Sequence, residues 1–355
     1  MADTRTNIRA ARPTISVGGE EQPFLAEGLI TLAIHEDVEG LFTCEAMFGN
    51  WGNVDGRADF LYFDRRLFDF GKSLSIKIGT ETVFAGRITA LEAHFPDGAS
   101  PQIAVLAEDR FQDLRMIRRT RTFVDVSDAD VMKQIAGDHG LTPDVTVDGP
   151  RHRVLAQVNQ SDLAFLRERA RAVGAELWVE NGTLHAKPRS LRGQSSVRLV
   201  YRRELREFSA LSDLAGQRTT VSVNGWDVAS KTALTHEATD STISPEVDGQ
   251  ESGVSILKSA LGERKEAIAH GMPVTSDEAR ARAESRFRLM ARRFVIGRGV
   301  AEPDPRLRVG ASADLQQLGP LFSGKYYVAD VRHLFDTTDG MRTEFTGERP
   351  GIGRP

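Results

Sequence analysis

The chain has 355 residues, of which 40% are hydrophobic and 27% charged, a composition typical of a soluble globular protein with two or three domains. Its net charge of -4 argues against a general binder of polyanions, and its single cysteine, Cys44, excludes an internal disulfide and fits a reducing cytoplasm. No apolar run is long enough for a membrane span, and the polar N-terminus lacks the apolar core of a secretory signal peptide.

Residues 1–125 are predicted to form a first β-barrel domain. Leu29 to His35 and Leu74 to Ile78 alternate apolar with small or polar side chains, as half-buried strands do. Glycines break the regularity between Gly49 and Gly56, so we expect a loop there that carries Trp51.

Residues 126–195 change character and are predicted to form a small inserted α/β module. Ser127 is placed to cap a helix that ends before Gly140, and Ser161 to cap a second helix that Gly174 stops. Asn181-Gly182 supplies the turn of a hairpin, because both residues tolerate the positive φ that a tight reversal needs.

Residues 196–350 are predicted to form a second β-barrel domain that includes a helical segment at about 254–295. Ser276 is expected to cap its longest helix, with Ala279, Ala283 and Phe287 on the buried face and Gly297 ending it. Residues 351–355 are expected to form a flexible tail. The fold class is therefore α+β, mainly β.

A short sequence pattern of the first β region recurs in the second. Glycines and a histidine at nearly equal offsets give a structural fingerprint of Gly71, Gly86 and His94 in the first region and Gly310, Gly324 and His333 in the second. Chance is the alternative, because glycine and alternating strands are common. A true duplication would allow an oligomer to imitate a ring with twice as many units.

The long helix and the stretch after it are rich in arginine: Arg280, Arg282, Arg286, Arg288, Arg292, Arg293 and Arg298. Such a face could bind phosphates, but the acidic net charge and the lack of interleaved aromatic residues weaken that interpretation. We expect a structural or protein-interface role for these arginines.

The sequence predicts no catalytic residue, no cofactor and no metal site. His139, His152 and His185 lie far apart, and neither a His-Glu-x-x-His motif nor a Gly-x-Ser-x-Gly elbow is present. His94 and His333 are expected to share a packing role at strand ends, since catalytic residues seldom need duplication.

Ordered motifs across most of the chain, from about Leu29 to Glu348, carry a family resemblance. They include Asn159-Gln-Ser-Asp-Leu, Val223-Asn-Gly-Trp-Asp, Asp304-Pro-Arg-Leu-Arg-Val-Gly and Phe322-Ser-Gly-Lys-Tyr-Tyr-Val. In this order they resemble the phage late control D proteins and the N-terminal hub portion of VgrG.

The resemblance implies a structural baseplate hub of a contractile injection system or phage tail. In that family two similar barrels per subunit form a pseudo-sixfold ring in a homotrimer, a symmetry adapter between a hexameric inner tube protein and a trimeric spike protein. Other baseplate proteins are further expected partners, and nucleic acid is expected only as cargo in the lumen. Assembly is expected in the cytoplasm of the producing bacterium, before the hub becomes part of the particle. VgrG continues into a needle that this sequence lacks, so the spike is expected to be a separate protein.

Aromatic residues crowd the segment from 51 to 70. Obligate interfaces are rich in such anchors, so we predict a subunit or tube contact at Trp51, Phe60, Phe63 and Phe68. The alternative is a simple barrel core, which aromatic residues also fill. Two competing classes for the whole protein are a β-scaffold glycoside hydrolase with two separated carboxylates and a carbohydrate-binding tail protein.

Overall fold

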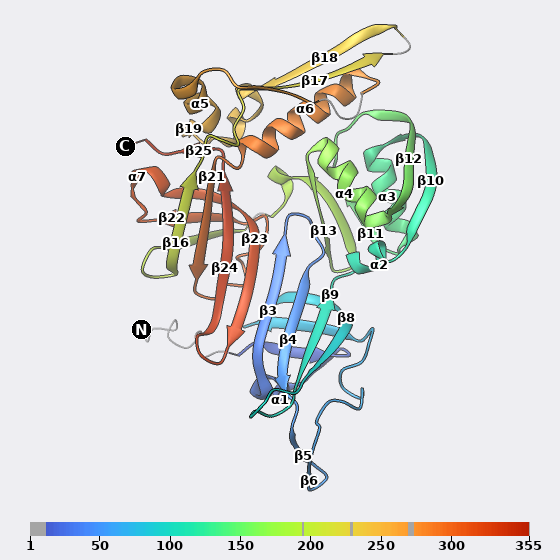
Figure 1. The fold of residues 1–355 in the computed structure, drawn as a ribbon, viewed down its shortest axis with the longest axis vertical. Coiled ribbons are helices and arrows are strands. Elements are labelled where there is room, and N and C mark those ends of the chain that lie inside the picture. The colour runs from blue at the N-terminus through green and yellow to red at the C-terminus, as the bar shows by residue number, and fades with distance from the viewer. Residues whose placement is uncertain (1–11, 194, 228–229, 269–272, 355) are drawn as a thin grey trace.

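A computed structural model describes residues 12–193, 195–227, 230–268 and 273–354 of the chain (Figure 1). The described part is mainly β, as predicted, and its strands join into a 13-stranded sheet and several small ones. The strands of the N-terminal half of the large sheet are β1 (Thr14–Val17), β2 (Glu20–Glu21), β3 (Leu29–Asp37), β4 (Thr43–Gly49), β7 (Ser73–Ile78), β8 (Glu81–His94) and β9 (Gln102–Glu108), with α1 (Pro23–Gly28) between β2 and β3.

The C-terminal half of the large sheet contains β15 (Ser196–Val200), β16 (Leu205–Ser212), β21 (Val295–Ala301), β22 (Ser312–Gln316), β23 (Gly324–Asp336) and β24 (Gly340–Arg349), with α7 (Gly319–Phe322) between β22 and β23. The main path of the sheet runs β16-β21-β24-β23-β3-β4-β9-β8-β7-β1-β2, while β22 pairs with β23 and β15 with β22. The two β regions are therefore one continuous sheet, joined where β3 pairs with β23.

The two halves repeat the same connectivity. The neighbours β3-β4-β9-β8-β7-β1 correspond to β16-β21-β24-β23-β22-β15, and the strands follow the same chain order in both halves. Their irregularities also match: the β3–β4 ladder shifts between Leu29 and Thr31 and the β16–β21 ladder between Leu205 and Glu207. There are two departures. β1 pairs antiparallel with β7, whereas β15 pairs parallel with β22. The β7–β8 ladder also shifts between Ile76 and Lys77, whereas the β22–β23 ladder is regular.

The register of the repeat follows from matching bulges. The β8–β9 ladder shifts between Ile88 and Ala90, and the β23–β24 ladder between Val328 and Asp330. The N–H of Gly71 donates to the carbonyl of Ile88 at 2.8 Å, and that of Gly310 to the carbonyl of Val328 at 2.9 Å. Gly71 and Gly310, with φ of 80° and 94°, therefore occupy the same position.

The other two fingerprint pairs are out of register. The matched bulges align His94 with Leu334 rather than His333, and Gly86 with Tyr326 rather than Gly324. A shift of one residue along a strand moves a side chain to the opposite face of the sheet. His333 is accordingly fully buried, whereas His94 is partly exposed beside Glu92, so the expected shared role of the two histidines is wrong.

Each half of the sheet encloses its own hydrophobic core. Alternating burial places every second residue of β24 inside, which explains its apolar and polar alternation. The first core takes side chains from β3, β4, β7, β8 and β9, and it also includes Phe335 and Met341 from the second half. The second core draws on β15, β21, β22, β23 and β24. The two halves thus share apolar packing as well as a ladder.

The inserted α/β module lies beside the N-terminal half (Figure 1). It comprises α2 (Phe111–Arg115), β10 (Arg118–Ser127), α3 (Asp128–Asp138), β11 (Thr142–Val145), β12 (Arg151–Ser161), α4 (Asp162–Val173), β13 (Ala175–Glu180), β14 (Thr183–Pro188) and η1 (Arg189–Leu191). Ser127 and Ser161 cap α3 and α4, Gly174 ends α4 with φ of 70°, and Asn181-Gly182 turns the hairpin, as predicted. The expected boundary at residue 125 is too late, because Phe111 and Phe123 already pack in the core of this module.

A second insertion separates β16 from β21. It contains β17 (Thr220–Asp227), β18 (Thr232–Thr239), η2 (Asp240–Thr242), η3 (Ser244–Glu246), β19 (Glu251–Ser252), α5 (Gly253–Leu261), β20 (Lys265–Ile268) and α6 (Ser276–Ala291). Thr275, not Ser276, caps α6, and the helix ends at Ala291 while Gly297 lies within β21. Gly297 is needed there because a Cβ would lie 2.3 Å from Cζ of Phe208.

The C-terminal residues are more ordered than expected. Gly351–Ile352 form β25, which pairs antiparallel with β19. The N–H of Gly253 also donates to the carbonyl of Pro350 at 3.0 Å. The expectation of a flexible tail is therefore wrong for this pair of residues, because β19 gives their backbone groups partners. Pro355 lies outside the described residues.

Candidate assembly surfaces

The junction between the two halves is held by polar and apolar contacts. His35 Nε2 lies 2.7 Å from an Asp330 carboxylate oxygen, and this hydrogen bond raises the pKa of His35. Glu36, which is 2% exposed, forms an ion pair with Arg308. On the core side, Leu32 lies opposite Phe335 in the β3–β23 ladder. The junction is therefore stabilised, within one chain, by a hydrogen bond, a buried ion pair and apolar packing.

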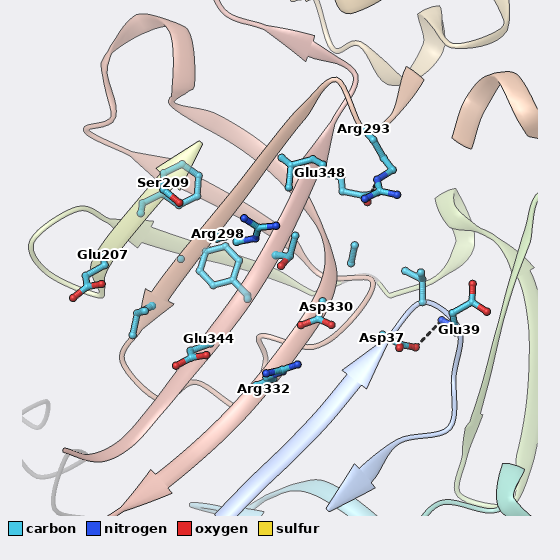
Figure 2. A pocket seen from close by; sticks show the side chains of 18 residues that line it. Asp37, Glu39, Glu207, Ser209, Arg293, Arg298, Asp330, Arg332, Glu344 and Glu348 are labelled. Atoms are coloured by element: carbon cyan, nitrogen blue, oxygen red, sulfur yellow. Dashed lines mark hydrogen bonds and ion pairs between the residues drawn. The ribbon is translucent and has the colours of Figure 1, made fainter. Parts of the chain in front are cut away.

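A hollow lies on the face of the sheet opposite the second core. Figure 2 shows charged side chains of β16, β21, β24 and β23, of the end of β3 and the turn after it, and of Arg293 just before β21, around it. The labelled ionisable residues are Asp37, Glu39, Glu207, Arg293, Arg298, Asp330, Arg332, Glu344 and Glu348. Six of these nine are acidic, so the hollow has an excess of negative charge. Its carboxylates lie on several strands of the same large sheet.

Exposed aromatic side chains gather where the hairpin of β5 (Gly52–Val54) and β6 (Arg57–Asp59) begins and ends. This hairpin projects from the end of the N-terminal half (Figure 1). The ring of Phe60 lies 5.2 Å from that of Trp51, 4.9 Å from that of Phe63 and 6.2 Å from that of Phe95, centroid to centroid. We call these four residues the aromatic cluster. Trp51, Phe60 and Phe95 are exposed, so the cluster offers apolar surface for contact.

The predicted contact residues therefore divide into two groups. Trp51, Phe60 and Phe63 belong to the aromatic cluster, whereas Phe68 is fully buried and stacks on Phe48 with centroids 5.2 Å apart. Phe68 is a core residue, and its predicted contact role is wrong because its ring is not accessible. Sequence reasoning missed Phe95, which lies 35 residues beyond Phe60 and joins the cluster only in the folded sheet.

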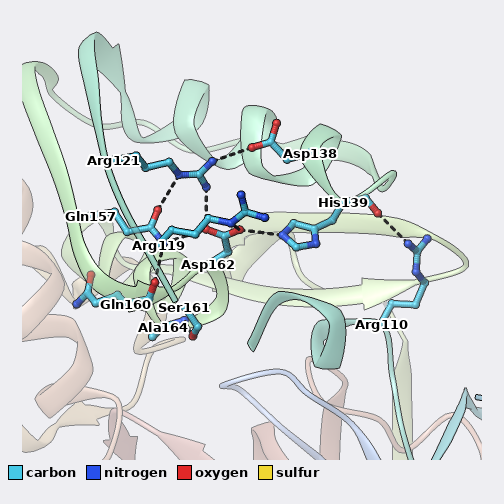
Figure 3. A network of polar contacts seen from close by, with 10 residues as sticks. All are labelled: Arg110, Arg119, Arg121, Asp138, His139, Gln157, Gln160, Ser161, Asp162 and Ala164. Carbon is cyan, nitrogen blue, oxygen red and sulfur yellow. Dashed lines mark hydrogen bonds and ion pairs between the residues drawn. The ribbon is translucent and has the colours of Figure 1, made fainter. Parts of the chain in front are cut away.

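A polar network in the α/β module gathers several ionisable side chains around one buried carboxylate. Figure 3 shows Asp162, which is 1% exposed, surrounded by Arg119, Arg121, His139 and Gln157. Burial would raise the pKa of Asp162, but the hydrogen bonds of His139 and Gln157 and the charges of the arginines lower it instead. Both carboxylate oxygens are engaged, so the network fixes β10 and β12 against α3 and α4.

One buried carboxyl group has the raised pKa that an acid catalyst needs. Burial raises the pKa of Asp109 to about 7. Its two oxygens accept hydrogen bonds from the backbone N–H groups of Phe42 and Phe111, at 3.0 and 2.9 Å. Asp109 thus connects the turn before β4 to α2 and performs a structural task.

The arginine-rich helix is neutralised along its length. Four arginines of α6 and the two that follow it pair with acidic groups: Arg280 with Asp277, Arg282 with Glu278, Arg286 with Glu266, Arg288 with Glu284, Arg292 with Glu246 and Arg293 with Glu348. The pairs between Arg292 and Glu246 are bidentate at 2.7 Å. This arrangement fits the expected structural role and leaves little free charge for phosphate.

The described residues contain no group of three or more His, Cys, Asp or Glu side chains arranged to hold a metal ion. No helix in the same ranges combines the length and apolar character needed to cross a bilayer.

Solved structures with a similar fold include tail proteins and a component of a type VI secretion system. The prophage MuSo2 43 kDa tail protein from Shewanella oneidensis matches with a TM-score of 0.71 and 13% identity, over 96% of this chain and 98% of that one. A tail protein from Neisseria meningitidis matches with a TM-score of 0.67 and 13% identity, over 96% and 97%.

An Escherichia coli type VI secretion component, described as similar in structure to the phage T4 tail proteins gp27 and gp5, matches with a TM-score of 0.59 and 11% identity, over 92% of this chain and 76% of that one. In sequence, residues 9–336 match the family described as the Alg8 N-terminal domain, and the chain belongs to that family. No curated protein sequence matches the chain.

Proposed function

We propose that this protein is the baseplate hub of a contractile injection system or phage tail, a homotrimer that adapts a hexameric inner tube to a separate trimeric spike. The observation that carries this proposal is the repeat of six strands with the same order of neighbours and two matching bulges in both halves. Three copies of such a chain present six similar units to one neighbour and three whole subunits to the other.

The electrostatics of the hollow fit a conduit. In a ring with this face turned inward, the acidic excess around Glu207, Glu344 and Glu348 would line the lumen. Like charges repel a polyanion, so nucleic acid cargo would pass without adhering. The same acidic surface does not exclude protein cargo.

The fold of the solved tail proteins supports the same role, since this chain aligns with the prophage protein over nearly its whole length. A structural role leaves catalysis to other subunits. Assembly takes place in the cytoplasm of the producing bacterium, and the hub then belongs to the baseplate of the particle, with the spike, the inner tube and other baseplate proteins as partners.

Size-exclusion chromatography with light scattering tests this proposal. We expect a mass of about 117 kDa for the protein alone, three times the 39.1 kDa of one chain, or a complex containing three copies of this chain plus the spike when the spike protein is added. Class averages in electron microscopy should then show a ring with six lobes and threefold symmetry. A monomer under all these conditions would contradict the proposal, and a monomer that hydrolyses glycans would favour the glycoside hydrolase.

A further inference from the structure

The junction between β3 and β23 provides a template for a contact between subunits. In this ladder Leu32 lies opposite Phe335 and Ile34 opposite His333. The repeat places Phe208 and Ala210 of β16 where Leu32 and Ile34 lie in β3. It likewise places Phe95, just after β8, where Phe335 lies, and Ala93 of β8 where His333 lies.

The strand segments equivalent to the junction have free edges in a single chain. Within the described ranges β16 pairs in a ladder only with β21, and residues 90–94 of β8 pair only with β9. The equivalent residues of β3 and β23 have partners on both sides. A free edge presents unpaired N–H and C=O groups that another strand can satisfy.

Side-chain exposure shows the same asymmetry. Phe335 is 6% exposed at the internal junction, whereas its equivalent Phe95 is 65% exposed. Leu211 is 64% exposed, although its equivalent His35 is partly covered by Asp330. An exposed phenylalanine and an exposed leucine on two free edges are apolar surface that a second strand would remove from water.

We propose that β16 of one copy pairs antiparallel with residues 90–96 of the next copy, in the register of the internal junction. Phe208 then lies opposite Phe95 of the next copy, and Ala210 opposite its Ala93. The contact rests on the proposed function, which it deepens by naming the surface that closes the trimer. Backbone hydrogen bonds supply affinity, and the aromatic pair fixes the register.

This contact is head-to-tail, so it closes a ring only if its rotation matches the number of copies. The internal junction already sets the step between two similar units. If the contact between chains has the same geometry, a trimer contains six equivalent contacts, three within chains and three between them. Each contact joins two half-sheets of one continuous wall. Phe95 also brings the aromatic cluster to the subunit boundary, which accounts for its exposure in the single chain.

Disulfide trapping in the full chain tests the register. We expect the double variant Ala93→Cys/Ala210→Cys to form covalent trimers on oxidation, and a mixture of the two single variants to form covalent dimers only. Directly opposed residues in an antiparallel pair have the Cβ separation that a disulfide needs. Cys44 does not compete, because burial raises the pKa of its thiol.

The control variant is Glu92→Cys/Ala210→Cys, whose cysteines would point to opposite faces of the sheet. It should remain uncrosslinked. If light scattering shows trimers but the two double variants crosslink equally or not at all, the register is overturned while the hub proposal survives. A protein that stays monomeric with and without the spike overturns both.

A second measurement uses charge instead of a crosslink. Phe95→Asp should raise the concentration at which half the chains are trimeric by roughly 30-fold or more, as expected for a buried aromatic anchor. Val124→Asp is the matched control, since Val124 is similarly exposed but lies on β10, away from both edges. Loss of the trimer in the Val124 variant, with no effect at Phe95, would assign the contact to β10 and β12 and overturn the proposal.

Discussion

The two halves of the large sheet have the same connectivity, but their equivalent edges meet different surroundings. At the internal junction, Phe335 and His333 are buried against β3, whereas the equivalent Phe95 and Ala93 lie on a free edge. Most ladders and two bulges are thus kept in both halves, while the side chains on each edge differ according to what covers them. Substitutions at three sites test this difference between the halves.

The largest effect is expected at Phe335. Phe335→Ala removes a ring from the first core and should lower the free energy of unfolding by about 3–5 kcal/mol. Phe95→Ala, at the equivalent position, should change the stability of the monomer by less than about 0.5 kcal/mol. Urea denaturation of both variants below the assembly concentration checks this. Equal losses at the two positions would show that the halves do not differ as described.

The second expected effect concerns pH and His333. Burial lowers the pKa of His333 to about 3, and the ring bonds Thr343 at 3.0 Å through Nδ1. The unfolded chain therefore binds one more proton than the folded chain between about pH 6.5 and 3. The free energy of unfolding should fall by about 1.4 kcal/mol for each pH unit of acidification in that window.

His333→Gln removes this proton from the balance while it keeps a polar group beside Thr343. The difference in stability between wild type and variant, measured by denaturation from pH 7 to 4.5, isolates the histidine from the buried acids Glu36 and Asp109. Parallel pH profiles would contradict the prediction.

The smallest effect compares the two glycines that share a repeat position. Gly71 and Gly310 both have positive φ, so alanine should cost about 1 kcal/mol at each through backbone strain. At Gly310 a Cβ would also lie 2.8 Å from Cγ of Arg192, whereas at Gly71 it meets no atom within 4 Å. Gly310→Ala should therefore lower the melting temperature more than Gly71→Ala, and the reverse order would refute the packing argument.

Local chemistry made several features predictable from the sequence. The caps at Ser127 and Ser161 and the turn at Asn181-Gly182 depend on backbone preferences of single residues, and all three are confirmed. Gly71 and Gly310 could be matched because both positions require positive φ. The mainly β class followed from alternation within short segments.

Features that depend on distant pairing could not be predicted. The segment from Gly310 to Val328 is one residue longer than the equivalent segment from Gly71 to Ile88, so equal sequence offsets did not mark equivalent positions for His94 and His333. Phe63 and Phe68 lie in the same aromatic-rich segment, and the sequence does not show which of the two rings is buried. In the fold, Phe68 lies in the core. Phe95 entered the candidate surface through a contact that no local pattern indicates.

The ladder between β3 and β23 also constrains how the polypeptide folds during synthesis. His35 must wait for Asp330, 295 residues later, before its strand gains its second neighbour. Until then the nascent N-terminal half has an incomplete core, which lacks Phe335 and Met341, and a strand edge open to other chains. Such high contact order predicts slow folding on the ribosome and a need for chaperones until translation is nearly complete.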